Sequence, residues 1–424
     1  MAEPGLDAIR DARRELDETI DDIRKVPGYE QFLAPPTFDD VARAAGGCPI
    51  VYLAAAELGG LALVVRGTDV VHLPLPQLSA ESLRARVTAH LDAYAGYRTD
   101  RDAHRADWYH SLDEITAWLW AAVVGPVLEQ VRPAAEAVFV PGGLLGLLPL
   151  HAAWTSDPTR PTGRRYALDE LAISYTPNAR SLQVARDAAA QLAPTALVAV
   201  AEPRPVPASD LPSAPYEALT VLSGFGPDSV VLRGGEATRR AFGRESARAT
   251  VLHLACHGYA DLADPLDSGL LMAGGPVTLR DLLNDYRLRV RLAVLSACET
   301  ALPGTELPDE VVALPTGLLQ AGVAGIVASQ WSVPDRATAM LMAEFYRRWS
   351  LGEVPVAVAL RDSQQWLRDT PNQRKRDRWR AQAGQRWLPA EVADYFDTAM
   401  LGQEPDARAH ENIHMWAAFA HVGA

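Results

Sequence analysis

The sequence predicts an α/β protein built on a large, mostly parallel sheet with helices on both faces. From about residue 195 onward, short apolar runs alternate with segments of helical periodicity, as in successive strand–helix units. Runs such as ALVAVA at 196–201 are apolar at nearly every position, which is typical of strands buried on both faces. A chain of 424 residues, 48% of them hydrophobic, is long and apolar enough to enclose such a sheet in a sizeable core.

The N-terminal part is expected to begin with a helix and continue into a meander of strands. Residues 5–25 place apolar positions among charges at helical spacing, which predicts an exposed lead-in or docking helix. Three runs rich in β-branched residues, separated by Gly-Gly and Gly-Thr-Asp, predict strands at 49–56, 60–67 and 68–75. Helices are expected at 79–95 and 113–131, followed by a buried strand at 137–143.

The C-terminal part alternates regularly between the two element types. We expect strands at 196–201, 229–234, 249–255, 291–297 and 324–330. Helices are expected between and after them, at 216–222, 237–246, 278–285, 309–322, 335–349 and 354–368. These changes of pattern divide the chain into a helical lead-in (1–46), a first α/β half (47–190) and a second α/β half (191–424).

Charge and motif content exclude several classes of function. The net charge of −13 at pH 7 disfavours nucleic acid and anionic membranes as partners. The dense basic run 371–386 is expected to form a solvated loop or helix face, with a phosphate-binding patch as the less favoured alternative. Phosphate-binding glycine loops, paired metal ligands and the Gly-x-Ser-x-Gly motif are all absent, so no metal or cofactor is expected.

The cysteine content and the N-terminus predict a cytoplasmic protein. Three cysteines are too few for a disulfide framework, and the first 25 residues are charged throughout, unlike a secretion signal. No apolar run approaches the ~20 residues that a membrane span needs. In a reducing compartment a cysteine can serve as a nucleophile.

Two predicted strands end in residues that suit nucleophilic catalysis. The strand 249–255 leads into Cys256, His257 and Gly258, and the strand 291–297 leads into Cys298. Active residues gather at the carboxyl ends of parallel strands, so His257 and Cys298 lie side by side if the strands are neighbours. An imidazole can generate the thiolate of a cysteine, while the N–H groups of Gly258 and Cys298 can form an oxyanion hole. The alternative is a packed core thiol beside a hydrogen-bonded histidine. We expect Cys256 to be such a core thiol, because strand alternation turns it away from His257.

The residues around these strand ends resemble the CHAT domain, which belongs to the caspase–separase group of cysteine peptidases. The resemblance rests on VLHLACHGYAD (251–261), LAVLSACETA (292–301) and GLLQAGVAGIVASQWSVPD (317–335), with weaker matches elsewhere in 110–424. It implies a caspase-like sheet, with a degenerate caspase-like half at 47–190 and the active half at 191–424. It also implies His257 as base or thiolate partner, Cys298 as nucleophile, and peptide hydrolysis through an acyl-enzyme.

Substrate-binding residues are predicted on the loops that follow these strands. Asp264 and Asp267 could line the site and favour a basic residue before the scissile bond, as in separase; the alternative is turn or helix-cap bonding. Trp331 could wall a subsite or simply fill the core. Glu299 could orient a neighbouring group or cap the next helix. The caspase signature around the cysteine is missing, and Ala297 stands where metacaspases carry an aspartate, so neither cleavage preference is expected.

The leading hypothesis is therefore a bacterial cytoplasmic cysteine endopeptidase that cuts a specific protein partner under regulation. A regulatory protein or sensor module is an expected second partner, and we expect a closed or disordered loop at 260–275 or 300–309. The alternative is a caspase-like scaffold or interaction module without turnover, and a cysteine acyltransferase is a third, weaker hypothesis.

Overall fold

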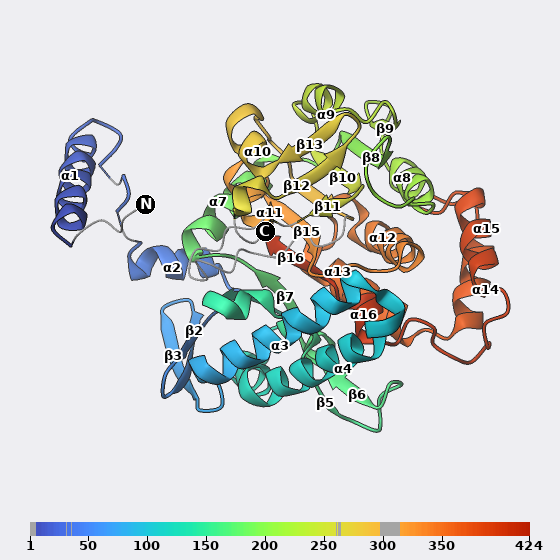
Figure 1. The fold of residues 1–424 in the computed structure, drawn as a ribbon, viewed down its shortest axis with the longest axis horizontal. Coiled ribbons are helices and arrows are strands. Elements are labelled where there is room, and N and C mark those ends of the chain that lie inside the picture. Colours follow the sequence, from blue (N-terminus) through green and yellow to red (C-terminus); the bar gives the residue numbers. More distant parts are fainter. Residues whose placement is uncertain (1–5, 31, 35, 260, 262–263, 297–313) are drawn as a thin grey trace.

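One long mixed sheet organises the molecule (Figure 1). The structure is a computed structural model that describes residues 6–30, 32–34, 36–259, 261, 264–296 and 314–424. The order of its strands is β3 (Asp69–Leu75), β2 (Gly59–Arg66), β1 (Ile50–Ala56), β4 (Glu136–Pro141), β7 (Ala172–Tyr175), β16 (Phe419–Gly423), β15 (Gly325–Ser329), β14 (Leu292–Leu295), β10 (Val251–Ala255), β8 (Leu197–Pro203) and β9 (Val230–Gly234). Antiparallel pairing occurs at β1–β2, β2–β3 and β15–β16, and the other neighbouring pairs are parallel. The predicted α/β class is confirmed.

Helices cover both faces of this sheet (Figure 1). Apart from α1 (Leu6–Arg24), the helical elements are α2 (Phe38–Ala45), α3 (Ala80–Thr99), α4 (Arg101–Leu119), a π-helical turn (Trp120–Val124), α5 (Gly125–Val131), α6 (Ala167–Glu170), α7 (Ala179–Gln191), α8 (Ala214–Leu222), α9 (Arg239–Ser246), α10 (Leu279–Asp285), α11 (Leu314–Gln320), α12 (Asp335–Trp349), α13 (Val356–Asp369), α14 (Asn372–Gln382), α15 (Ala390–Ala399) and α16 (Ile413–Trp416). The sequence placed the start of α4 twelve residues too late, at 113. Asp100 caps this helix, because its carboxylate accepts from the N–H groups of Asp102 and Ala103.

The last strand of the chain joins the two predicted halves into one sheet. β16 lies between β7 of the first half and β15 of the second, parallel to β7 and antiparallel to β15. Each buried strand needs a hydrogen-bonded neighbour on both sides, and β16 supplies it for both halves. The division of the chain at 190/191 stays a prediction.

Strand β10 separates two layers of the core. Leu252, Leu254 and Cys256 belong to one buried cluster, together with α9, α10 and α11, while Val251 belongs to the cluster on the other face that includes α12. Cys256 is 1% exposed. The prediction that Cys256 is a core thiol is therefore confirmed.

The N-terminal helix and the basic run 371–386 differ in how they contact the rest of the protein. The predicted N-terminal helix is present as α1, which projects away from the sheet (Figure 1), with Leu16 exposed. The basic run 371–386 forms α14 and the turn after it. One face of α14 is exposed, as expected for a solvated helix face, while Lys375 and Trp379 on its other face are buried.

Several cationic side chains of α14 have partners within the protein. The ammonium of Lys375 donates to the carbonyl of Leu367 at 2.7 Å, and burial lowers its pKa to about 7. Arg376 pairs with Asp397 of α15, and Arg378 pairs with Glu344 of α12. These ion pairs hold neighbouring helices together. Arginines engaged in this way are less available to bind the phosphate backbone of a nucleic acid.

Among the described residues, one helical stretch could cross a membrane by length and composition. It spans Arg101–Val131, and half of its apolar window is buried inside the protein. Burial of this kind is typical of a core helix in a globular protein.

Candidate active site at the strand ends

The candidate site is built from the carboxyl ends of neighbouring parallel strands. β10 pairs with β14, so the adjacency on which the His257–Cys298 hypothesis depends is confirmed at the level of the strands. In this register Val251 lies beside Leu292 and His253 beside Val294, an offset of 41 residues. His257 follows β10 by two residues and is half-buried.

A backbone carbonyl holds the imidazole of His257. Its Nε2 lies 2.8 Å from the carbonyl oxygen of Ser209, in the loop after β8, the strand on the other side of β10. A carbonyl oxygen can only accept, so the proton of a neutral His257 lies on Nε2 and the Nδ1 lone pair is left available. Ser209 was not predicted from the sequence. The loop 204–213 does follow a predicted strand end, which is the signal that could have found it.

The chain after His257 is fixed by the small antiparallel meander of β11 (Gly258–Tyr259), β12 (Gly269–Met272) and β13 (Gly275–Thr278). The carbonyl of His257 accepts from the N–H of Leu271 at 2.8 Å, and Gly258 lies opposite Leu270. Two sides of His257 are thus anchored, its backbone by β12 and its ring by Ser209. The role of Gly258 as an oxyanion donor stays a prediction.

A narrow cavity of about 30 Å³ opens at the same strand ends. Its walls include Cys256, Ser296 and Ser329, which directly follow or end β10, β14 and β15. Leu211 and Asp335 also line it. This volume holds about one water molecule, so a substrate side chain enters only if the walls move.

Asp335 supplies the carboxylate of this cavity. It is the first residue of α12, and its Oδ2 accepts from the N–H of Ser213 at 2.6 Å. Burial raises the pKa of Asp335 despite that bond, and the nearby carboxylates of Glu217 and Glu202 raise it further. A cationic group placed in the cavity would relieve this cost. Asp335 was not predicted from the sequence, although it lies five residues after the end of the strand 324–330, within WSVPD.

The two aspartates predicted to line the site are engaged elsewhere. Arg280 of α10 donates to Asp264 and to Asp267, at 3.1 Å in each case. Asp264 also caps a short 3₁₀ turn, Pro265–Asp267, by accepting from the N–H of Leu266. This is the turn and cap alternative, and neither aspartate lines the cavity.

Trp331 combines the two predicted alternatives. Its ring is 1% exposed and packs edge-on against Trp108 at 6.1 Å, and its Nε1–H donates to the carbonyl of His414 at 3.0 Å. Trp331 also lines the cavity. It is a core residue that also delimits the cavity.

Cys298, Glu299 and the predicted loop 300–309 lie outside the described residues. Of the predicted loop 260–275, the part from 264 onward is ordered into the 3₁₀ turn, β12 and the start of β13. The two described cysteines do not suit nucleophilic catalysis, because Cys256 is buried and burial raises the pKa of Cys48 to about 11.

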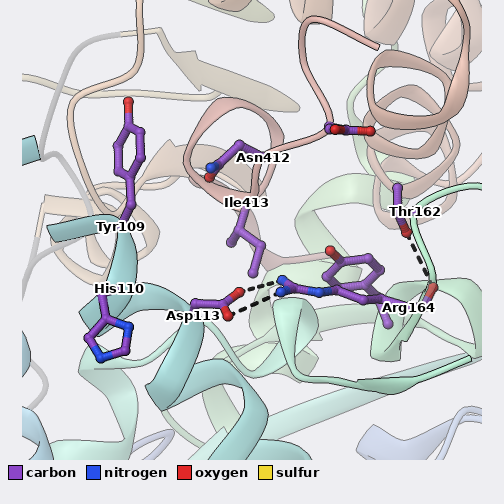
Figure 2. A pocket seen from close by; sticks show the side chains of 9 residues that line it. Tyr109, His110, Asp113, Thr162, Arg164, Asn412 and Ile413 are labelled. Atoms are coloured by element: carbon purple, nitrogen blue, oxygen red, sulfur yellow. Dashed lines mark hydrogen bonds and ion pairs between the residues drawn. The ribbon is translucent and has the colours of Figure 1, made fainter. Parts of the chain in front are cut away.

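The part of the chain that the structure describes holds no group of three or more His, Cys, Asp or Glu side chains that could bind a metal. A larger hollow of about 440 Å³ lies between α4, the segment before α16 and the hairpin of β5 (Trp154–Ser156) and β6 (Arg164–Tyr166) (Figure 2). Figure 2 shows Asp113 and Arg164 facing each other there as an ion pair. This pair satisfies both charges, and the hollow shares no lining residue with the cavity at the strand ends.

Comparison with known families decides the classification. The family model of the CHAT domain matches residues 113–424, which is most of the chain. The protein belongs to the CHAT family. The matched region covers β10, β14, β15 and the described candidate site, and it begins within α4 of the first half. A search of curated proteins finds no significant match to this CHAT protein.

Two solved structures of separase show a similar fold. Two crystal structures of the Saccharomyces cerevisiae separase–securin complex match 91% of this CHAT chain, with TM-scores of 0.58 and 0.59 at 10% and 9% identity. The match covers only 30% and 31% of those separase chains. The Arg-specific cysteine proteinase gingipain R matches 74% of the chain and 67% of its own length, with a TM-score of 0.37 and 8% identity. The separase likeness establishes a caspase-like fold, as the sequence resemblance implied.

Proposed function

We propose that this CHAT protein is a cysteine endopeptidase that uses His257 as base and Cys298 as nucleophile. The observation that carries the proposal is the half-buried imidazole at the end of β10, whose Nε2–H is engaged by the Ser209 carbonyl. The ring is thereby oriented with Nδ1 available, beside the strand that leads to Cys298. Because Cys48 and Cys256 are unsuited, Cys298 is the remaining thiol.

The strand register supports this pairing. Residues on β10 lie beside residues 41 positions later on β14, and His257 and Cys298 are also 41 positions apart in the sequence. Neighbouring parallel strands that end together bring the residues after them to the same edge of the sheet. The pairing of β10 with β14 therefore supports the pair that the sequence motif suggests.

The proposed reaction proceeds through a thioester. Nδ1 of His257 takes the proton of the Cys298 thiol, and the thiolate adds to the carbonyl carbon of the scissile peptide. The N–H groups of Gly258 and Cys298 stabilise the resulting oxyanion. The C–N bond then breaks as the imidazolium protonates the leaving amine. Water, deprotonated by His257, hydrolyses the thioester and restores the thiol.

We propose that the preferred residue before the scissile bond is arginine or lysine, and that Asp335 selects it. Asp335 is the carboxylate that lines the cavity, whereas Arg280 neutralises Asp264 and Asp267. A guanidinium or ammonium brought to Asp335 would pair with a carboxylate that burial has left poorly stabilised. The cavity of about 30 Å³ is smaller than such a side chain, so its walls must move for the side chain to enter.

The expected setting is a bacterial cytoplasm, with a protein substrate and a regulatory protein. The separase structures are complexes with securin, so a protein partner on this fold has a structural precedent. For this chain both the partner and the location are proposals.

The first test compares wild type with Cys298→Ala and His257→Ala, using Cys48→Ala as the matched control. Cleavage of a peptide library should be lost in the first two variants, with circular dichroism unchanged, and kept in the control. Iodoacetamide at neutral pH should label Cys298 much faster than Cys48. Unchanged cleavage by Cys298→Ala overturns the proposal, and equally slow labelling of both thiols without cleavage favours a scaffold.

A further inference from the structure

The loop that carries the Ser209 carbonyl is itself held by one side chain, Arg204. Its Nη1 donates to the carbonyl of Ala208 at 2.8 Å, and its Nη2 donates to the carbonyl of Ser209 at 2.8 Å. Nη2 also contacts the carboxylates of Asp210 at 2.6 Å and Glu202 at 3.2 Å. The planar guanidinium thus sits inside the turn and binds two successive carbonyls.

The carbonyl oxygen of Ser209 is the point where Arg204 and His257 meet. It accepts from Nη2 of Arg204 and from Nε2 of His257, both at 2.8 Å. A carbonyl oxygen has two lone pairs, so the two donors can occupy it together. The direction of the Ser209 carbonyl therefore depends on the guanidinium on one side and the imidazole on the other.

The backbone before Arg204 is shaped for this arrangement. The pairing of β8 with β9 shifts register between Ala201 and Pro203, and Glu202 between them has a φ of 48°. A β-bulge of this kind re-aims the side chains at the end of a strand. The carboxylate of Glu202 then accepts from the N–H of Leu211 at 3.0 Å and from Arg204, which closes the loop back onto the strand. A residue with positive φ costs free energy that the surrounding contacts must offset.

We propose that Arg204 is a positioning residue that holds the Ser209 carbonyl against His257 and thereby keeps the proton of the imidazole on Nε2. The inference rests on the proposed function, because an oriented Nδ1 matters only if His257 is the base. A plain surface ion pair is the alternative, since Asp210 is 86% exposed and such pairs contribute little. The two bonds to main-chain carbonyls distinguish the cases, because an ion pair with Asp210 does not require them.

A spectroscopic test addresses the imidazole without any need for activity. In the Cys298→Ala background, the protein is labelled with ¹⁵N-histidine, and the His257 signals are assigned by their loss in His257→Asn. Wild-type Arg204 should give a slowly exchanging Nε2–H and a single tautomer. Arg204→Met should lose this signal or show mixed tautomers, while Arg84→Met, on the exposed face of α3, should not. A retained Nε2–H signal in Arg204→Met overturns the inference.

Kinetics in the wild-type background separate positioning from substrate binding. Arg204→Met should lower kcat by about 10–100-fold, the range typical for losing a group that orients a metal-binding histidine, and leave KM within about twofold. Arg204→Lys keeps the charge but not the two-pronged geometry, so it should fall between wild type and Met. Asp210→Asn keeps both carbonyl bonds and should retain kcat within about twofold.

The outcomes remain distinguishable. If circular dichroism shows that Arg204→Met does not fold, the test uses Arg204→Lys instead. A kcat and His257 signals in Arg204→Lys that equal those of wild type overturn the inference. A loss of kcat in Asp210→Asn equal to that in Arg204→Met also overturns it in favour of the ion pair. If wild type neither cleaves peptides nor labels at Cys298, the proposed function fails, while the histidine spectra still decide whether Arg204 positions the ring.

Discussion

Asp335→Asn is the substitution that most sharply tests how this site would recognise a substrate. The change keeps the size of the side chain and one oxygen that can still accept from the N–H of Ser213. It removes only the negative charge that lines the cavity. Because the fold already raises the pKa of Asp335, loss of the charge should not destabilise the protein, so changes in cleavage reflect recognition.

The expected magnitude follows from the position of the carboxylate. Two unit charges about 4 Å apart near a protein surface, at an effective dielectric constant of about 20, attract by about 4 kcal/mol. Asp335 is half-buried, and the amide of asparagine still offers an acceptor to a cation, so part of this energy is retained. A net loss of about 2–3 kcal/mol corresponds to a decrease in kcat/KM of about 30- to 150-fold for a substrate with arginine before the scissile bond.

The assay uses two fluorogenic peptides that differ only in having arginine or glutamine before the cut. Asp335→Asn should reduce the arginine-to-glutamine ratio of kcat/KM by the full factor and leave the glutamine substrate nearly unchanged. Asp264→Asn and Asp267→Asn are the matched controls, since Arg280 already neutralises both carboxylates. An unchanged ratio in Asp335→Asn, or an equal drop in either control, refutes the assignment of Asp335.

Three further predictions follow from the buried groups. Asp335 has a raised pKa, so on acidification it loses its charge at a higher pH than an ordinary aspartate does. For an arginine substrate, kcat/KM should therefore begin to fall at that higher pH. A pH profile identical to that of Asp335→Asn contradicts this. In the folded protein the pKa of Lys375 is lowered to about 7, so between pH 7 and its ordinary pKa the unfolded chain binds more protons than the folded one. Wild type should therefore gain stability from pH 7 to pH 9 relative to Lys375→Met. Urea midpoints of the two proteins that change equally with pH would argue against this. Gly224→Ala would place a Cβ 1.9 Å from the ring of Trp387 and should cost about 1–3 kcal/mol in urea unfolding, whereas Gly226→Ala, with nothing within 4 Å, should cost much less.

The fold class and the positions of the main strands along the chain could be predicted because they depend on local patterns. Continuous apolar runs between helical segments specify strands buried on both faces, and these runs appear as β8, β9, β10, β14 and β15. The strands β7 and β16 were not predicted. β7 has only four residues, and β16 takes its place through pairing with residues far away in the sequence.

The candidate site was predictable where its residues directly follow a strand. His257 follows β10, and the pairing of β10 with β14 agrees with the prediction. Asp264 and Asp267 were predicted to line the site from their nearness to His257 in the sequence, but Arg280, on a helix further along, determines where their carboxylates point. The partners of Arg376 and Arg378 in the basic run 371–386 were likewise not predictable, because they lie on α15 and α12.

The sequence by itself determined the fold class and the family, and it identified His257 as a candidate site residue. These conclusions depend on apolar periodicity and short motifs, which are properties of consecutive residues. Only the tertiary structure decided that the Ser209 carbonyl holds this imidazole, that Arg204 holds that carbonyl, and that Asp335 lines the cavity. The physical reason is that a hydrogen bond or an ion pair depends on which groups meet in space. The sequence cannot reveal which backbone carbonyl becomes a hydrogen-bond partner, because every residue has one.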